Sequence, residues 1–249
     1  MQDLKGRVTV ITGAAGGIGS ATARALAERG GRLVLVDRSG EALAALAADL
    51  AGAEALTIAA DVSSEADMTG MAGQAIARFG RIDALITSAA ILRKGEGVRM
   101  ISETSFDEWR AIIDVNLTGT FLANRAVLPA MLEQKEGDII NISSVSGRQG
   151  RAFDGPYSAS KAGIIGLSES LSEEVARQGI RVQTVLPDAV DTGLWSQSGG
   201  VALKPQAMLA PSRVAELLLY LLGLPRDTYL LNPVVVPVPT RRRKGKSKS

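Results

Sequence analysis

Short apolar runs rich in β-branched residues alternate along the chain with longer stretches whose apolar residues recur at helical spacing. The runs at positions 34–36 and 139–140 are continuous rather than alternating, which is typical of strands covered on both faces. The predicted strands are Arg7–Thr12, Arg32–Asp37, Ala55–Asp61, Ile82–Ala89, Asp138–Ser143 and Ile180–Leu186. The predicted helices are Gly17–Arg29, Gly40–Leu50, Glu65–Phe79, Phe106–Gln134 and Pro156–Arg177.

This βαβ repetition predicts an α/β fold with a single Rossmann-type, doubly wound parallel sheet of about seven strands and helices on both faces. The segment Pro233–Pro239 contains three prolines, so any strand there is expected at the sheet edge. Nothing within residues 1–240 resembles a linker. We therefore expect one domain over residues 1–240, followed by a basic disordered tail over residues 241–249.

Charge is unevenly distributed along the 249 residues. The chain has 28 Lys and Arg against 26 Asp and Glu, and six of the basic residues lie in the segment 241–249. Without that segment, 22 basic residues face 26 acidic ones, a net charge of −4. A mildly acidic body does not favour nucleic acid as a specific partner.

Targeting and membrane signals are missing from the pattern. The apolar run Leu217–Leu224 is far shorter than the roughly 20 residues that a membrane span needs. The first residues also lack the basic and apolar regions of a secretory signal. We therefore expect a cytoplasmic protein without membrane association.

Histidine and cysteine are both absent from the sequence. This excludes a Ser-His-Asp triad, a thiol nucleophile and His- or Cys-ligated metals, so no metal site is expected. Acid–base chemistry near neutral pH must therefore use a carboxylate, a lysine or a tyrosine with a shifted pKa.

A glycine-rich turn, Thr12–Gly19, connects the first predicted strand to the first predicted helix. Gly13 allows a tight turn, Gly17 allows close approach of a ligand, and Gly19 allows the helix to pack near the strand. The helix start offers unpaired N–H groups to a pyrophosphate. Because no Gly-Lys-Ser/Thr follows, the turn is not a triphosphate P-loop. Ordinary turn glycines are the alternative, but the position within a βαβ unit favours a dinucleotide.

Asp37 ends the second predicted strand, 18 residues after Gly19. A carboxylate there can accept hydrogen bonds from both ribose hydroxyls and would repel a 2′-phosphate. An ordinary strand-end aspartate is the alternative interpretation. Arg38 could tolerate a phosphate, so the pattern predicts NAD(H) as the preferred cofactor and leaves NADP(H) possible.

Tyr157 and Lys161 are spaced i, i+4 near the start of a predicted helix, which places the phenol and the ammonium on one face. A nearby cation stabilises a phenolate, which suits proton exchange with a carbonyl/alcohol pair. By itself, this spacing is also a common surface pairing.

Several motifs in this order resemble the classical short-chain dehydrogenases/reductases over roughly residues 5–240. The matching motifs are the turn Thr12–Gly19, Asp61-Val62, Val115-Asn116-Leu117, Ile142-Ser143-Ser144, Tyr157 with Lys161, and the segment from Pro187 to Thr192. Ser144 also precedes Tyr157 by 13 residues, which is the family spacing.

The resemblance implies an NAD(P)-dependent oxidoreductase that transfers hydride between the nicotinamide and a carbonyl or secondary alcohol carbon. It implies a catalytic tetrad in which Tyr157 is the acid/base, Lys161 lowers its pKa and binds the ribose, Ser144 orients the substrate oxygen, and Asn116 supports a water-linked proton path. It also implies that the cofactor contacts are Gly13, Gly17, Ile18, Gly19, Asp37, Arg38, Asp61, Val62, Ser88, Ala89, Tyr157, Lys161, Pro187, Val190 and Thr192.

The chain departs from the family pattern at Thr87–Ala90, which is usually Asn-Asn-Ala-Gly, and at Asp188, which is usually Gly. These departures keep open a non-enzymatic NAD-binding regulator or scaffold as the alternative function. A sugar-nucleotide epimerase, which has a similar Tyr/Lys pair, usually needs a larger C-terminal region than this length allows.

The expected partner is a small-molecule substrate, either 3-oxoacyl-thioester-like or another small apolar carbonyl. Its expected contact regions are Ile91–Ser102, Ser146–Pro156 and Gly193–Leu209. Basic residues in the first two, such as Arg93 and Arg151, could meet an anionic group but are interpreted first as solvated loop charges.

Family members pair two long helices across a two-fold axis. The predicted helix Phe106–Gln134 and the Tyr157-bearing helix are apolar on more than one face, including Leu117, Phe121 and Leu128, and Ile164, Leu167 and Leu171. The resemblance therefore implies a homo-oligomer, most simply a homotetramer.

Overall fold

The computed structural model describes residues 2–50, 52–95, 97–198 and 205–238. Within them lies a seven-stranded parallel sheet of order β3-β2-β1-β4-β5-β6-β7. Its strands are β1 (Val8–Thr12), β2 (Arg32–Asp37), β3 (Ala55–Ala59), β4 (Ala84–Thr87), β5 (Gly137–Ile142), β6 (Ile180–Pro187) and β7 (Val234–Val235). The predicted α/β fold is confirmed. The predicted tail over residues 241–249 lies outside the described residues.

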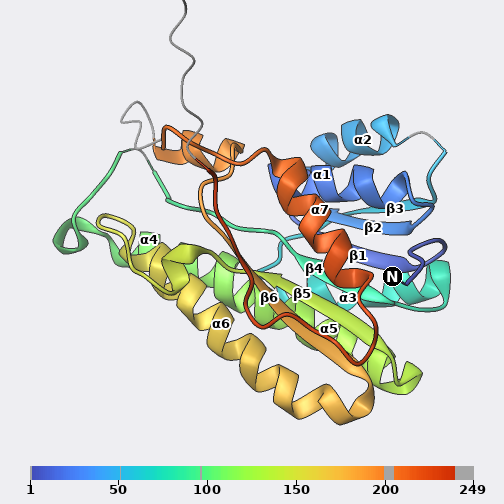
Figure 1. Ribbon diagram of the computed structural model, residues 1–249. Helices are drawn as coiled ribbons and strands as arrows, with labels where there is room; N and C mark the ends of the chain where they lie inside the picture. The colour runs from blue at the N-terminus through green and yellow to red at the C-terminus, as the bar shows by residue number, and fades with distance from the viewer. Residues whose placement is uncertain (1, 51, 96, 199–204, 239–249) are drawn as a thin grey trace, which may run out of the picture.

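Helices cover both faces of the sheet (Figure 1). One face carries α1 (Gly17–Ala27), α2 (Gly40–Asp49) and α7 (Pro211–Leu222), and the other carries α3 (Glu65–Phe79), α5 (Gly119–Gln134) and α6 (Gly155–Val175). Successive strand residues supply the two cores: Leu33 and Leu35 face the first group of helices, whereas Val34 and Val36 face the second. This double burial explains the continuous apolar runs in the sequence.

The predicted helix Phe106–Gln134 is interrupted in the structure. It comprises α4 (Phe106–Ile113), a π-helical turn η2 (Asp114–Thr118) and then α5. The helical pattern did not show this interruption, because one extra residue in a turn barely changes apolar spacing. Such turns are often found at functional sites, and this one carries Asn116. The remaining short turns are η1 (Ile101–Glu103), η3 (Val145–Gly147), η4 (Ala176–Gln178) and η5 (Gly193–Ser198).

Helix α7 has no counterpart among the predicted elements. The apolar run on this helix is too short for a membrane span, and Leu218 and Leu221 are fully buried against the rest of the chain. Contacts between α7 and α1 close the sheet face beneath the glycine turn. No helix in the described part of the chain is long and apolar enough to cross a bilayer.

Three strand predictions need comment. β7 lies at the sheet edge, as the prolines around it predicted. β3 ends at Ala59 rather than at position 61, and β4 covers only Ala84–Thr87 of the predicted 82–89. Asp61 and Ser88, which follow these two strands, therefore belong to the loops at the carboxyl edge of the sheet.

Candidate active site

Strand order reverses between β1 and β4, which are neighbours in the sheet but lead to strands on opposite sides. Loops that follow the two strands diverge there and leave a crevice, the usual ligand position in doubly wound folds. A cavity of about 520 Å³ lies at this edge. It is lined by the glycine turn, the ends of β5 and β6, η3, the start of α6 and η5. Its size suits a small molecule.

The glycine turn leaves no room for side chains. Gly13 has φ of +66°, and a Cβ there would lie 2.5 Å from the Ala89 nitrogen. A Cβ on Gly19 would lie 2.2 Å from the Gly13 oxygen, and one on Gly17 would lie 2.5 Å from Cγ2 of Thr192. The turn is thus packed against the loop after β4 on one side and against Thr192 on the other, and its residues 15–18 line the cavity.

Two carboxylates stand at the ends of β2 and β3. Asp37 accepts hydrogen bonds from the Ala15 nitrogen at 3.1 Å and from the Ser39 nitrogen at 3.2 Å. Asp61 accepts hydrogen bonds from the nitrogen and the hydroxyl of Ser63 at 2.9 and 2.6 Å. These bonds hold the pKa of Asp61 below its usual value, and the positive charge of Arg38 acts in the same direction. Asp37 is thus bonded to the glycine turn itself, whereas Asp61 is held by the loop after β3.

The other predicted cofactor contacts divide into two groups. The group that lines the cavity comprises Gly17, Ile18, Ser88, Pro187, Val190 and Thr192. Ala89 instead packs beneath Gly13. Val62 is buried in the core and would be 2.8 Å from a Cβ on Gly119, so its side chain packs against α5 rather than lining the cavity. The predicted cofactor contact at Val62 stays a prediction.

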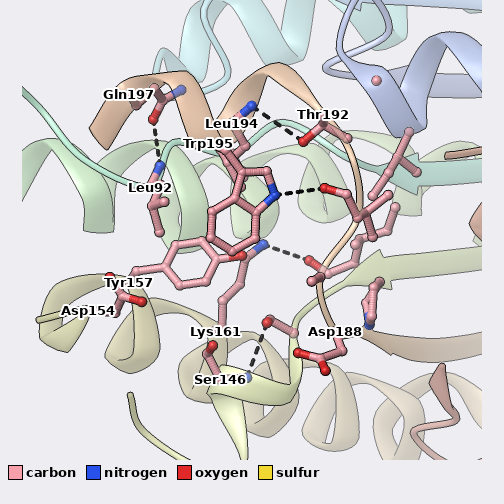
Figure 2. A pocket seen from close by; sticks show the side chains of 18 of the residues that line it. Leu92, Ser146, Asp154, Tyr157, Lys161, Asp188, Thr192, Leu194, Trp195 and Gln197 are labelled. Carbon is pink, nitrogen blue, oxygen red and sulfur yellow. Dashed lines mark hydrogen bonds between the residues drawn. The ribbon is translucent and has the colours of Figure 1, made fainter. Parts of the chain in front are cut away.

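Ser144, Tyr157 and Lys161 converge on the cavity from two elements. Ser144 follows β5, and the other two residues lie on successive turns of α6. Lys161 Nζ lies 5.6 Å from the centre of the Tyr157 ring and donates a hydrogen bond to the Ile142 oxygen at 2.8 Å. Figure 2 shows the phenol and the ammonium side by side at the base of the cavity. The helical spacing in the sequence predicted this pairing.

Asn116 lies behind the cavity rather than in its wall. It is fully buried, and its Oδ1 accepts a hydrogen bond from the Ile91 nitrogen at 2.8 Å. Its Nδ2 donates to the Ile91 oxygen at 2.9 Å and to the Ser160 hydroxyl at 3.0 Å. The side chain therefore joins the loop after β4 to α6 within one turn of Tyr157.

Burial changes the protonation of both α6 residues. It raises the pKa of Tyr157 to about 12, with a hydrogen bond to Ser144 acting against this shift and the charge of Asp154 adding to it. Burial lowers the pKa of Lys161 to about 7. At neutral pH the phenol accordingly holds its proton, whereas the lysine can exchange one. Such displaced titrations are typical of catalytic groups.

The outer wall of the cavity comes from η5. Trp195 donates a hydrogen bond through Nε1 to the Val190 oxygen at 2.8 Å. Gln197 Oε1 accepts hydrogen bonds from the nitrogens of Leu92 and Arg93 at 2.7 and 3.3 Å. Figure 2 shows the Trp195 indole lying across the Tyr157 ring. The predicted contact region Gly193–Leu209 covers both Trp195 and Gln197, but the bonds of Gln197 were not predicted, since no pattern marks a side chain that bonds to a distant backbone.

Two arginine–aspartate pairs flank the cavity. Arg93 NH2 lies 2.5 Å from Asp154 Oδ1, and its side chain is only 6% exposed. The prediction of a solvated loop charge is therefore wrong for Arg93, because a guanidinium with a carboxylate partner can be buried. Arg151 NH2 lies 2.8 Å from Asp188 Oδ1 in a half-exposed pair. Asp188, which stands where the family usually has Gly, thus carries a neutralising partner.

Comparisons with known proteins agree with this geometry. The family model for short chain dehydrogenases matches residues 7–200. An uncharacterized oxidoreductase of Staphylococcus saprophyticus subsp. saprophyticus is 36% identical over 241 residues, which cover 96% of this chain and all of that protein. A 3-oxoacyl-[acyl-carrier-protein] reductase of Synechocystis sp. is 39% identical over 197 residues, or 78% of each chain.

A solved structure of similar shape is that of NAD⁺-bound xylitol dehydrogenase. It has a TM-score of 0.85 and 27% identity, and the match covers 94% of this chain and 99% of that one. The shared fold extends over nearly the whole described chain. Together with the family match and the relatives, this shows that the chain belongs to the short-chain dehydrogenase/reductase family and is an oxidoreductase.

Proposed function

We propose that this protein interconverts a ketone and a secondary alcohol with a nicotinamide dinucleotide. The observation that carries the proposal is the convergence of Ser144, Tyr157 and Lys161 on a cavity at the strand-order reversal, directly beside the glycine turn. A non-enzymatic regulator would not need a buried phenol paired with a lysine whose pKa is displaced to about 7.

The residues present fit a dinucleotide. A Cβ at Gly13, Gly17 or Gly19 would collide with neighbouring atoms, so the turn offers bare backbone N–H groups at a helix start, where a pyrophosphate binds well. Asp37 and Asp61 provide carboxylate oxygens as acceptors for the adenosine half, and Thr192 closes over Gly17. When bound, the nicotinamide ring supplies or accepts a hydride.

The residues of the chain itself manage the proton. Tyr157 donates its phenolic proton to the carbonyl oxygen during reduction and takes it back during oxidation. A protonated Lys161 next to the ring stabilises the phenolate that remains. Ser144, which bonds to the phenol, orients the same substrate oxygen. Asn116 acts indirectly, because its hydrogen bonds hold Ile91 and Ser160 in place. Its predicted part in a water-linked proton path stays a prediction.

Cofactor preference follows from Asp37. Its carboxylate is already held by the Ala15 and Ser39 nitrogens, so it cannot turn away from a ribose without losing both bonds. Arg38 interacts electrostatically with Asp61 and is therefore less available to a 2′-phosphate. We propose NAD(H) as the preferred cofactor and NADP(H) as the weaker one.

The substrate is proposed to be a small apolar carbonyl compound. Leu92, Leu194 and Trp195 pack in one cluster with Tyr157 and form the wall that a substrate must contact. A 3-oxoacyl-thioester-like compound remains a candidate, since a relative at 39% identity carries that activity in its name.

The proposal is tested by measuring NADH and NADPH oxidation with a panel of ketones and 3-oxoacyl thioesters, together with calorimetric binding of both cofactors. We expect turnover of at least one apolar ketone, with NADH preferred. Tight cofactor binding without turnover of any panel member would favour the regulator instead.

We also propose a homotetramer. Phe106 and Phe121 on α4 and α5 are 71% and 41% exposed, which is unusual for aromatic residues on a lone chain. Two residues named for this interface, Ile164 and Leu171, are instead buried in the chain's own core, because α6 packs that face on the sheet. Light scattering over a range of concentrations decides the matter, and a constant monomer mass would contradict the tetramer.

A further inference from the structure

We propose that Arg93 is a positioning residue for Tyr157: it neutralises Asp154 and fixes the chain segment that leads into α6, so that the phenol is held in place and gives up its proton more readily. This inference rests on the proposed role of Tyr157 as the acid/base. Arg93 is not one of the four tetrad residues, and no local sequence pattern indicates its contacts.

The guanidinium of Arg93 joins two parts of the cavity wall. NH2 contacts Asp154 Oδ1 at 2.5 Å, and NH1 donates to the Phe153 oxygen at 2.7 Å. The backbone nitrogen of the same residue donates to Gln197 at 3.3 Å. Arg93 thus connects the loop after β4 to both the α6 entry and η5. Buried arginines of this kind act through rigid, two-pronged geometry that a lysine cannot copy.

The segment Phe153–Asp154, which Arg93 contacts, has a strained backbone. Phe153 has φ of +67°, a left-handed conformation that costs a non-glycine residue free energy unless its surroundings impose it. The Arg93 guanidinium holds the carbonyl of this same residue. Because Tyr157 lies only four residues further along the chain, any relaxation at Phe153 would shift the first turn of α6.

Asp154 departs from the usual behaviour of an aspartate at its position. It is the residue before α6, where an aspartate side chain normally accepts a hydrogen bond from the first helical turn. Here its side chain makes no such cap. The carboxylate contacts Arg93 instead of the first turn of α6.

Electrostatics gives the pair a second effect on Tyr157. The charge of Asp154 raises the pKa of the phenol, so an unpaired carboxylate there would oppose phenolate formation. The other charged groups that line the cavity with the phenol are Lys161 on α6, Arg93 after β4, Arg151 before α6 and Asp188 after β6. Helix α4, which packs on α6, carries the buried Glu108. Glu108 is paired with Arg99, Arg151 is paired with Asp188, and Arg93 is paired with Asp154.

The test compares Arg93→Met, Asp154→Asn and the double variant with the unaltered protein. The first readout is the pH dependence of kcat/KM for alcohol oxidation, with whichever alcohol the panel identifies. We expect Arg93→Met to raise the apparent pKa by about one unit and Asp154→Asn to lower it. The double variant should return close to the unaltered value, because it removes the charge that Arg93 neutralises. Arg93→Lys should keep the pH profile but lower kcat/KM, since it loses the contact with Phe153.

A second readout needs neither cofactor nor substrate. Phenolate absorbance is titrated with and without the change Tyr157→Phe in each background, and the difference isolates Tyr157 from Tyr220 and Tyr229. Asp154→Asn should move this titration to lower pH. Lys94→Met is the matched control, because it removes an exposed positive charge next to Arg93 and should leave both readouts unchanged.

The outcomes separate two failures. If Tyr157→Phe retains activity, the proposed function fails. If Tyr157→Phe is inactive but neither Arg93→Met nor Asp154→Asn shifts the pH profile, or if the double variant keeps the shift of Arg93→Met, the positioning role is overturned. Should Arg93→Met not fold, the lower apparent pKa of Asp154→Asn and the lower kcat/KM of Arg93→Lys still test the role.

Discussion

Charged groups are buried both where the parallel strands begin, the amino edge of the sheet, and where they end, the carboxyl edge. Their surroundings differ between the two regions. At the amino edge, Asp138 is fully buried and is met by Arg181 at 2.8 Å, Arg7 at 2.5 Å and Arg226 at 3.2 Å. At the carboxyl edge, Tyr157 and Lys161 are buried without an opposite charge at hydrogen-bond distance in the described chain, and both have displaced pKa values. A buried charge with oppositely charged partners, such as Asp138, holds elements of the fold together. Buried titratable groups without such partners, such as Tyr157 and Lys161, remain able to exchange protons.

The amino edge also anchors the C-terminal segment. Arg181 donates hydrogen bonds to the backbone oxygens of Leu221, Pro225 and Thr228 in addition to its bond with Asp138. These contacts join α7 and the chain beyond it to β6. The comparison therefore predicts that changes at the two edges have separable effects, on stability at one and on chemistry at the other.

The largest effect is expected from Tyr157→Phe. Loss of the phenolic proton should lower kcat by about 100- to 10,000-fold, since that is the usual contribution of a general acid/base. NADH binding and the free energy of unfolding should change little, because the ring remains in its cluster. Steady-state kinetics, calorimetry and urea unfolding check this, and activity within tenfold of the unaltered protein would contradict it.

Asp138→Asn is expected to lower stability while leaving cofactor binding in place. It leaves buried arginines without their carboxylate and should lower the free energy of unfolding by about 3–5 kcal/mol. NADH binding measured at low temperature should persist. Glu216→Gln is the control, because the Arg213–Glu216 pair on α7 is exposed and worth less than about 1 kcal/mol. Equal losses in urea unfolding for the two variants would remove the distinction between the edges.

The pH dependence of stability should come from the carboxyl edge. Burial lowers the pKa of Lys161 from 10.5 to about 7, so between these values the unfolded lysine binds a proton that the folded one has released. The free energy of unfolding of the cofactor-free protein should therefore rise with pH from about 7 to 10, by up to about 1.4 kcal/mol per unit. Lys161→Met should lack this contribution. Parallel stability curves for the two proteins would show that Lys161 titrates normally.

The smallest effect is expected from Asp37→Ser. The carboxylate should favour NAD(H) over NADP(H) by at least about tenfold, which corresponds to about 1.4 kcal/mol. Its removal should shift the preference toward NADP(H), with no loss of stability at the amino edge. Comparing kcat/KM for both cofactors in both proteins checks this. A preference for NADPH in the unaltered protein would show that Asp37 does not face the ribose.

Local patterns predicted much of this architecture. Continuous apolar runs reported doubly covered strands, and the i, i+4 spacing placed Tyr157 beside Lys161, because both depend on neighbours in sequence. Helix α7, which begins at Pro211, is not among the predicted helices. The π-turn at Asn116 also escaped notice, because it adds a single residue to an otherwise helical pattern.

Contacts between distant loops could not be predicted. Arg93 and Asp154 are 61 residues apart, and Leu92 and Gln197 are 105 apart. Nothing in the composition of either loop distinguishes a buried guanidinium from a solvated one. Only the folded chain shows that three loops at the carboxyl edge share one set of hydrogen bonds.

Trp195 gives the cavity an optical signal of its own. The chain has two tryptophans, and the other, Trp109, lies on α4 outside the cavity lining. The indole of Trp195 is pinned by its bond to Val190 and lies across Tyr157 (Figure 2). Its emission therefore depends on what enters the space beside it. Replacing Trp109 by Phe would leave Trp195 as the single tryptophan, so that ligand entry could be followed in real time through its emission without a label.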